Sequence, residues 1–435
     1  MVGLIRVAAA LALLTCLPHE VSAYSVLAHE ANIDAAWKES IRPLLAARFP
    51  RATGAELDKA RAYAYGGSVI QDLGYYPFGS HFFSNLLHYI RSGDFVEALV
   101  DEARDVNELA FALGALGHYA ADNTGHPVAV NRAVPLMFPK LRLKYGDRVT
   151  YVESPSTHVL VEFSFDVVQA AAGAYASQTY HDFVGFEVSK PVLERAFRRT
   201  YGLEMRAVFS DADLAVSTYR HAIGQLIPEI TRVAWQDKRE EILKIMPNAS
   251  EQAFAFRLSR AQYEKEFGAD YQKPGVFTRL LTFVYKLLPK IGPLRPLKFE
   301  TPTREAEALF LESLKETGTR YRGALGRLRA GRLDLANTDF DTGRPAAYGE
   351  YPLADDTCAE LLDRLEREHF ATVSSALRQN ILAFYKSAAN PRAAVGSNES
   401  AGQERREVSR KDSKKDAKRD RKIRAQLAAL AADVQ

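Results

Sequence analysis

The stretch "LGALGHYAADNTGHP", residues 113–127, places His118, Asp122 and His126 at intervals of four in an otherwise mostly apolar pattern. Residues at positions i, i+4 and i+8 of a helix lie along one face. The stretch therefore predicts a buried helix that carries two imidazoles and a carboxylate in a row. Burying such a row costs free energy unless a positive charge lies in front of the carboxylate, so a cation site is the first interpretation.

The rest of the chain has the helical pattern of this stretch. Its 435 residues are 47 % hydrophobic and 26 % charged, which is typical of a soluble globular protein with one large domain or two ordinary ones. Apolar residues recur at three- and four-residue spacing in 31–49, 94–122, 158–176 and 211–235. Convincing alternating strands are scarce, so the predicted fold class is all-α. Asp211 is the predicted N-cap of the last helix, and Gly66–Phe83 is predicted to be an ordered loop.

A second helical region is predicted after the first, over residues 247–392. Thr301 and Pro302 predict the N-cap and first residue of one helix, and 356–388 predicts another. Between them, Asp334–Pro352 is predicted to be a long loop. Its Asp339 and Asp341 are similar to the start of a calcium loop, but no Gly and Glu follow at the positions that an EF-hand needs.

The N-terminus, "MVGLIRVAAALALLTCLPHEVSA", is typical of a secretory signal peptide. Arg6 precedes a short apolar run, and Val-Ser-Ala ends the segment before Tyr24. The sequence predicts cleavage after residue 23 and a secreted or periplasmic protein, with an uncleaved anchor as the alternative. Removal of Cys16 with the signal leaves Cys358 as the one cysteine, so the mature chain has no internal disulfide.

The C-terminal 393–435 is predicted to be a basic, disordered tail, with partial helix towards 425–434 as the alternative. Between Ala401 and Arg424, eleven Lys or Arg face five Asp or Glu, an excess of six in a chain whose whole formal charge is +3. The rest of the chain is therefore net acidic by three. Such a tail suits peripheral contact with an anionic membrane, with nucleic acid as the alternative. The sequence predicts no obligate protein partner.

Further potential metal ligands lie between Tyr24 and Glu162, mostly in segments that otherwise look buried. They are His29, Asp72, His88, and the i, i+4 pair His158 and Glu162. Each alone has an ordinary explanation as a core histidine or a helix pair. Together they need partners, because buried imidazoles and carboxylates are rarely left unpaired. Nitrogen and oxygen ligands without a thiolate suit zinc or a similar divalent ion.

The order of these residues resembles the zinc-dependent phospholipases C and the fungal single-strand-specific zinc nucleases of the same superfamily. The resemblance implies a secreted all-α fold with up to three zinc ions in one cleft, and a free α-amino group of Tyr24 as a ligand. It also implies three ligand groups. These are Asp72, His88 and His118; Tyr24 and His29 with a bridging Asp122; and His126, His158 and Glu162.

The implied reaction is phosphodiester hydrolysis through a zinc-bound hydroxide, with Asp72 as general base. The preferred substrate is a glycerophospholipid. The alternatives are a single-strand-specific nuclease and a non-catalytic, metal-stabilised envelope protein. The Asp122–His126 spacing is shorter than in the family, so His126 either reaches the third ion from another direction or misses it. His81 is predicted to support a ligand, to be an alternative ligand, or to be structural.

Overall fold

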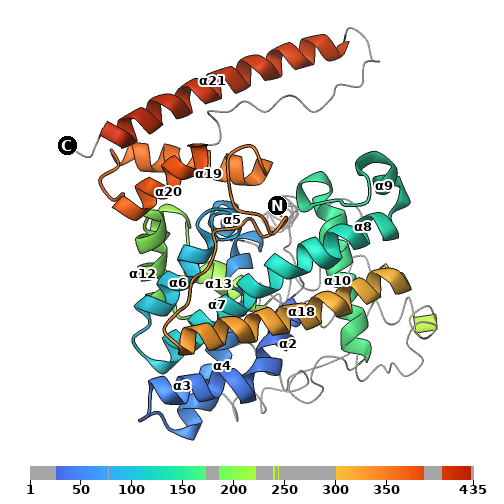
Figure 1. The fold of residues 1–435 in the computed structure, drawn as a ribbon, viewed down its shortest axis with the longest axis vertical. Coiled ribbons are helices and arrows are strands. Elements are labelled where there is room, and N and C mark those ends of the chain that lie inside the picture. Colours follow the sequence, from blue (N-terminus) through green and yellow to red (C-terminus); the bar gives the residue numbers. More distant parts are fainter. Residues whose placement is uncertain are drawn as a thin grey trace, which may run out of the picture.

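The computed structural model describes residues 26–76, 78–172, 186–221, 239–240, 243, 300–386 and 404–432. Every regular element in these ranges is a helix or helical turn (Figure 1), and a lone β-bridge joins Thr338 to Pro345. The predicted all-α class is confirmed. None of the helices in the described ranges is long and apolar enough to span a membrane. The signal segment 1–23, Tyr24 and the predicted boundary near 246 lie outside the described residues.

The first part of the chain forms a group of helices around α7. Before it come α2 (Val26–Ala36), η1 (Trp37–Ile41), α3 (Arg42–Arg48), α4 (Gly54–Val69), η2 (Ile70–Tyr75), α5 (His81–Tyr89) and α6 (Ser92–Glu102). Next are α7 (Val106–Gly125), η3 (His126–Val130), α8 (Asn131–Met137), α9 (Pro139–Tyr145), η4 (Tyr151–Glu153) and α10 (Pro155–Ala172). They are followed by α12 (Lys190–Tyr201), η5 (Met205–Ala207) and α13 (Ala212–His221). The N-cap of α13 is Asp211, as predicted, because its Oδ1 accepts from the Leu214 amide at 2.9 Å.

Helices α4 and α7 pack backbone against backbone through glycine. A Cβ on Gly67 would lie 1.8 Å from the carbonyl oxygen of Phe111, and one on Gly114 would lie 2.0 Å from that of Ala64. Only glycine permits so close an approach. It brings the last turn of α4, whose carbonyl groups lack partners within the helix, against α7, the helix that carries His118 and Asp122.

The C-terminal helices extend the same core. They are α18 (Arg304–Arg329), α19 (Pro352–Arg367), α20 (Ser375–Lys386) and α21 (Glu404–Ala432). Figure 1 shows α18 lying along α7, where the Tyr321 hydroxyl donates to the Leu113 carbonyl at 2.8 Å. Phe310 of α18 stacks on Phe165 of α10 with ring centroids 4.6 Å apart. One contiguous hydrophobic cluster includes residues from both parts of the chain.

Three local predictions differ from the structure. Gly66–Phe83 is mostly helical, because α4 continues to Val69, passes into the 3-10 turn η2, and is followed by α5. The N-cap of α18 is Thr303, whose hydroxyl accepts from the Ala306 amide at 3.1 Å, and not Thr301. The predicted helix 356–388 is broken between α19 and α20, where His369 and Phe370 have positive φ values of 52° and 56°. A left-handed backbone ends a right-handed helix.

The predicted disordered tail contains α21, which lies over α19 and α20 at one end of the molecule (Figure 1). Its second half has a buried apolar edge that includes Ile423 and Leu430. Its charges pair with α19, with Lys422 Nζ 2.6 Å from Asp363 Oδ2. Apolar burial and opposite charge on α19 explain why so basic a segment packs as a helix.

The glycine contact between α4 and α7 predicts a large effect of one methyl group. We expect Gly114→Ala to lower the free energy of unfolding by about 1–3 kcal/mol or more, because the new Cβ meets the backbone oxygen of Ala64. Gly326→Ala in α18 is the matched control, since nothing lies within 4 Å of its Cβ position. There alanine should be neutral or stabilising. Urea unfolding followed by circular dichroism measures both, and equal effects would contradict the close packing.

Candidate metal centre

The Asp122 carboxylate lies at the centre of a buried cluster of imidazoles. Its Oδ1 is 3.5 Å from Nε2 of His29. Its Oδ2 is 3.1 Å from Nε2 of His118, 3.4 Å from that of His88 and 3.9 Å from that of His126. These histidines come from α2, α7, α5 and η3, and all five residues are at most 2 % exposed. One carboxylate thus faces different histidines with its two oxygens, the arrangement that a bridging ligand needs.

A second carboxylate, that of Asp72 in η2, lies on one side of this cluster. Its Oδ1 is 3.3 Å from Nε2 of His88 and 3.8 Å from Nε2 of His118. The two imidazole Nε2 atoms are themselves 3.5 Å apart. Potential ligand atoms of Asp72, His88 and His118 all lie within 4.8 Å of one another, as do those of His29, His118 and Asp122.

Backbone carbonyl groups orient two of the imidazoles. His118 Nδ1 is 2.9 Å from the Ser68 carbonyl at the end of α4, and His88 Nδ1 is 2.8 Å from the Ser84 carbonyl. A carbonyl oxygen only accepts, so Nδ1 carries the hydrogen in each pair. Nε2 of both rings is then the atom that faces the carboxylates and is available as a metal ligand.

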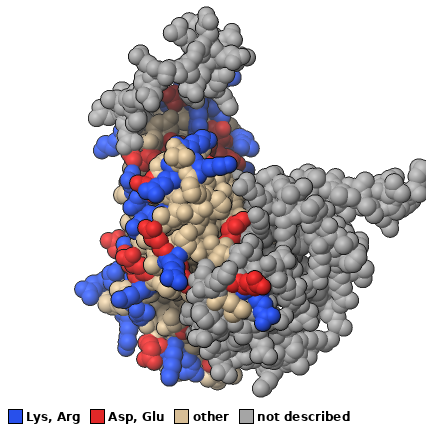
Figure 2. All heavy atoms as spheres, turned by 90° about the vertical axis from the view of Figure 1, so that its right-hand side faces the viewer, with Lys and Arg blue, Asp and Glu red and all other residues tan. Residues whose placement is uncertain are grey.

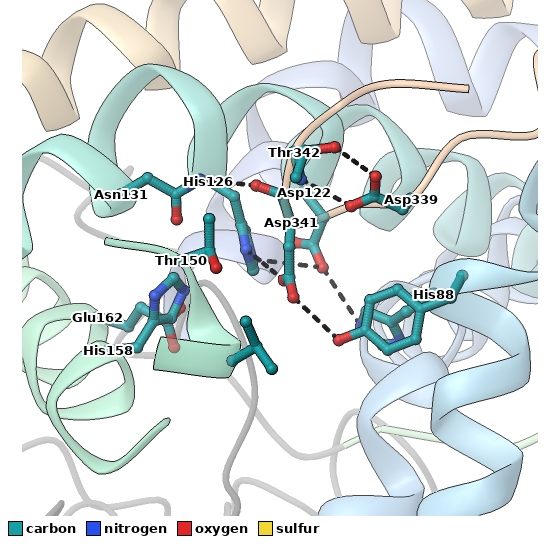
Figure 3. Close-up of polar contacts among 12 residues, drawn as sticks. His88, Asp122, His126, Asn131, Thr150, His158, Glu162, Asp339, Asp341 and Thr342 are labelled. Carbon is teal, nitrogen blue, oxygen red and sulfur yellow. Dashed lines mark hydrogen bonds and ion pairs between the residues drawn. The ribbon is translucent and has the colours of Figure 1, made fainter. Parts of the chain in front are cut away.

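The third predicted group lies beside the first two. His126 opens η3, a π-helical turn that interrupts the α-helix after Gly125, with Pro127 as its second residue. Its ring centroid is 5.0 Å from that of His158 in α10. Nε2 of His158 is 2.8 Å from Oε1 of Glu162. Potential ligand atoms of these three residues also lie within 4.8 Å of one another, and Figure 3 shows His126 between this pair and Asp122. His126 therefore reaches the third group in spite of its short spacing from Asp122.

The loop before α19 reaches this centre, and the sequence did not indicate it. Oδ1 of Asp341 is 2.9 Å from Nδ1 of His126. The Phe340 amide donates to the His88 carbonyl at 3.1 Å, and the Phe340 ring packs edge-on against the His88 ring at 5.2 Å. The acidic residues at 339 and 341 were the available signal. Nothing in the sequence shows, however, that a loop 215 positions after His126 lies beside it.

The residues of these groups fit a bound cation. Both carboxylate oxygens of Asp122 and of Glu162, and both ring nitrogens of His158, make no hydrogen bond of ordinary geometry within the described part of the chain. Unpaired buried polar atoms cost roughly 1–3 kcal/mol each, more when charged. A divalent ion pairs with such atoms directly, and imidazole with carboxylate is a ligand set that zinc accepts.

The pKa values of the clustered histidines and carboxylates are shifted in opposite directions. Burial alone would lower the pKa of His88, but contacts with Asp122 and Asp72 outweigh burial and raise this pKa to about 10. Burial would raise the pKa of Asp122, but the charges of His118 and the other nearby histidines hold it well below its usual range. Burial lowers the pKa of His158 to about 3 and raises that of Glu162 well above its usual range.

The structure brings the predicted side-chain ligands among the described residues together in three groups, and their role as metal ligands stays a prediction. His118 belongs to the group of His29 and Asp122 as well as to that of Asp72 and His88. Tyr24 lies outside the described residues, so its predicted part in the site stays a prediction. His81 joins none of the three groups. Its ring packs against Tyr75, with centroids 5.7 Å apart, and Tyr75 packs against His88 at 5.6 Å.

Zinc binding at neutral pH is predicted to release protons. At pH 7 the metal-free protein carries a proton on His88, whose pKa is about 10, and this proton leaves when Nε2 binds a cation. The affinity for zinc should therefore rise with pH through the neutral range. Calorimetric titration with zinc in buffers of different ionisation enthalpy measures the number released. His88→Asn should release about one proton fewer, and equal heats in all buffers would contradict the assignment.

Comparison with known proteins identifies the domain that holds this centre. Residues 32–211 match the family model described as zinc dependent phospholipase C. No curated protein and no solved structure matches the chain. The family match covers Asp72 and all the candidate ligands that follow it, and it supports phosphodiesterase or phospholipase activity in general. Residues 32–211 of the protein therefore match the zinc-dependent phospholipase C family.

Proposed function

We propose that this protein is a secreted zinc-dependent phospholipase C that hydrolyses glycerophospholipids. One observation carries the proposal: three adjacent groups of buried imidazoles and carboxylates come together, and all their members except His29 lie in residues 32–211, which match the zinc-dependent phospholipase C family. Up to three zinc ions are proposed, one for each group. Asp72, His88 and His118 would hold the first, His29 and Asp122 the second, and His126, His158 and Glu162 the third.

Zinc ions in such a site lower the pKa of water and compensate the negative charge of a phosphodiester in the transition state. The protein's own contribution is to place donors and acceptors around the reacting phosphorus. Asp72 is proposed as the general base, since its carboxylate lies beside the cluster, with Oδ1 3.3 Å from Nε2 of His88 and 3.8 Å from Nε2 of His118. It takes the proton of the attacking water.

The overall reaction is a hydrolysis at phosphorus. The water oxygen bonds to phosphorus while the bond between phosphorus and the glycerol oxygen breaks. The products are diacylglycerol, whose oxygen gains a proton, and a phosphorylated headgroup. The same chemistry applied to the phosphodiester of a nucleic acid is the nuclease alternative.

Surface charge supports a lipid rather than a polyanion as substrate. On the face shown in Figure 2, basic and acidic side chains of the described residues alternate. The chain outside 401–424 is net acidic by three. A tightly bound polyanion usually meets a basic surface, because phosphate contacts with Lys and Arg dominate its affinity.

The ligand chemistry supports catalysis rather than a purely structural site. Structural zinc is usually held by a closed set of four ligands, often including cysteine. Here Cys358 lies in α19 and is in none of the three groups found among the described residues. Asp122 and His118 contact members of more than one group, which suits a multinuclear site.

The proposal includes cleavage after Ala23 and export, which place the α-amino group of Tyr24 near the second group. Helix α2 begins at Val26 and carries His29, and its Leu27 amide donates to Asp166 of α10 at 2.9 Å. Two residues span at most about 7 Å, so an amino group at Tyr24 lies within reach of the start of this anchored helix. Peripheral contact of the basic C-terminal segment with an anionic membrane is a further expectation, although Arg419 and Lys422 pair with Asp356 and Asp363.

Substrate assays test the reaction. Phospholipids in mixed micelles should be hydrolysed, and denatured DNA and RNA should be hydrolysed far more slowly. Asp72→Asn should reduce kcat by about 10²–10⁴-fold, the usual contribution of a general base. His118→Ala and chelation by EDTA should abolish turnover.

The matched control for these variants is His369→Asn. His369 is exposed, lies in the turn after α19, and has the left-handed backbone that asparagine tolerates. It should retain full activity. Turnover of DNA rather than lipid would favour the nuclease. Loss of thermal stability on chelation, from a protein that hydrolyses neither substrate, would favour the structural alternative.

The N-terminus can be tested separately. N-terminal sequencing of exported protein should begin at Tyr24, with close to three zinc ions per chain by elemental mass spectrometry. A chain with two extra residues before Tyr24 has no α-amino group at that position. It should bind one of its ions more weakly, while its melting temperature in EDTA stays unchanged. Equal zinc affinity in both forms would exclude the amine as a ligand.

A further inference from the structure

The loop between α18 and α19 is anchored to the candidate centre by several polar contacts, although it lies outside residues 32–211. Two hydrogen bonds from α6 hold the first half of the loop. The Ser92 hydroxyl donates to the Thr338 carbonyl at 2.7 Å, and the Asp94 amide donates to the Asn337 side chain at 3.0 Å. The Asn131 side-chain amide donates to the Asp341 carbonyl at 2.7 Å. The backbone at Asp341 is therefore held beside η3, where His126 lies.

The Asp341 side chain is aimed at His126 by two tyrosines. Its Oδ2 accepts from the hydroxyl of Tyr89 at 3.1 Å and from that of Tyr351. Its Oδ1 is 2.9 Å from Nδ1 of His126, and Figure 3 shows the Asp341 side chain beside His126. Asp341 is 2 % exposed. The contact with His126 is an ion pair that is not aligned as a linear hydrogen bond.

The position of Asp341 is that of an orienting group and not of a ligand. It is in none of the three groups whose potential ligand atoms lie within 4.8 Å of one another. It meets Nδ1 of His126, whereas Nε2 of the same ring points toward Asp122. A carboxylate on the second nitrogen of a ligand histidine fixes the ring orientation and makes the first nitrogen a better donor.

We infer that Asp341 is a positioning residue for the metal centre, supplied to it by the C-terminal part of the chain. It holds His126 in the orientation in which Nε2 faces the bound cations, and Tyr89 and Tyr351 hold Asp341 in turn. The inference rests on the proposed zinc centre. It adds that residues 32–211 alone lack the carboxylate that orients the His126 ring.

Zinc affinity, measured on the full-length chain, tests this role independently of hydrolysis. Asp341→Asn keeps the shape of the side chain and removes its charge. We expect the weakest-bound zinc ion to dissociate about 10–100-fold more readily, as measured by competition with chelators of graded strength. The visible spectrum of the cobalt-substituted protein should change too, because the His126 ligand is reoriented. Tyr351→Phe, which removes one hydroxyl from Asp341, should shift the affinity in the same direction by a smaller factor.

Asp339→Asn is the matched control. Asp339 is buried in the same loop, but its carboxylate accepts from Thr342 rather than contacting an imidazole. It should leave zinc affinity and the cobalt spectrum unchanged. Circular dichroism and melting in EDTA establish that each variant folds. A merely structural role for Asp341 would lower the melting temperature in EDTA and leave the affinity of the folded protein unchanged.

Wild-type zinc affinity in folded Asp341→Asn would overturn the inference. If that variant does not fold, an unchanged affinity in Tyr351→Phe would do so. The proposed function fails in a different way. Wild-type protein that binds zinc but hydrolyses neither lipid nor nucleic acid would overturn the phospholipase proposal and leave the role of Asp341 standing, whereas wild-type protein that binds no zinc would overturn both.

Discussion

The buried carboxylate of Asp122 is the constraint on which the arrangement of the helices depends. Four imidazole Nε2 atoms lie 3.1–3.9 Å from its oxygens, and they come from α2, α5, α7 and η3. Two of these elements, α2 and α5, must converge on α7, and η3 continues α7 directly. A charge without water around it is costly unless it is paired. The fold supplies that pairing from several directions at once.

The convergence is achieved by backbone features more than by side-chain shape. Gly67 and Gly114 let α4 and α7 touch, which brings the Ser68 carbonyl to the His118 ring. The 3-10 turn η2 then turns the chain so that Asp72 faces His88 and His118. A π-helical turn begins at His126, the residue that lies beside His158 and Glu162. Interruptions of this kind are frequent at functional sites.

The C-terminal part of the chain contributes to the same centre. Helix α18 shares the core through Tyr321 and Phe310, and the loop after it places Phe340 on His88 and Asp341 on His126. The family match ends at residue 211, so these contacts come from beyond the matched residues. They explain why an apparent connecting loop is buried at 340 and 341.

The sequence alone determined the helical class and the identity of most candidate ligands. Both follow from local pattern: apolar spacing specifies helices, and histidines and carboxylates in apolar segments require a partner. The order of those residues was enough to indicate the family that residues 32–211 match. The i, i+4 pair of His158 and Glu162, and that of His118 and Asp122, are set by helix geometry itself.

The tertiary structure decided what spacing along the chain does not encode. The sequence left open whether His126 reaches the third group, because the answer depends on how α10 packs against η3. It treated Gly66–Phe83 as a loop and the C-terminal tail as disordered, because the partners that make them helical lie elsewhere in the chain. Asp341 became visible as part of the centre only when the fold placed it 2.9 Å from His126. Such contacts arise from packing between distant segments, which no local pattern specifies.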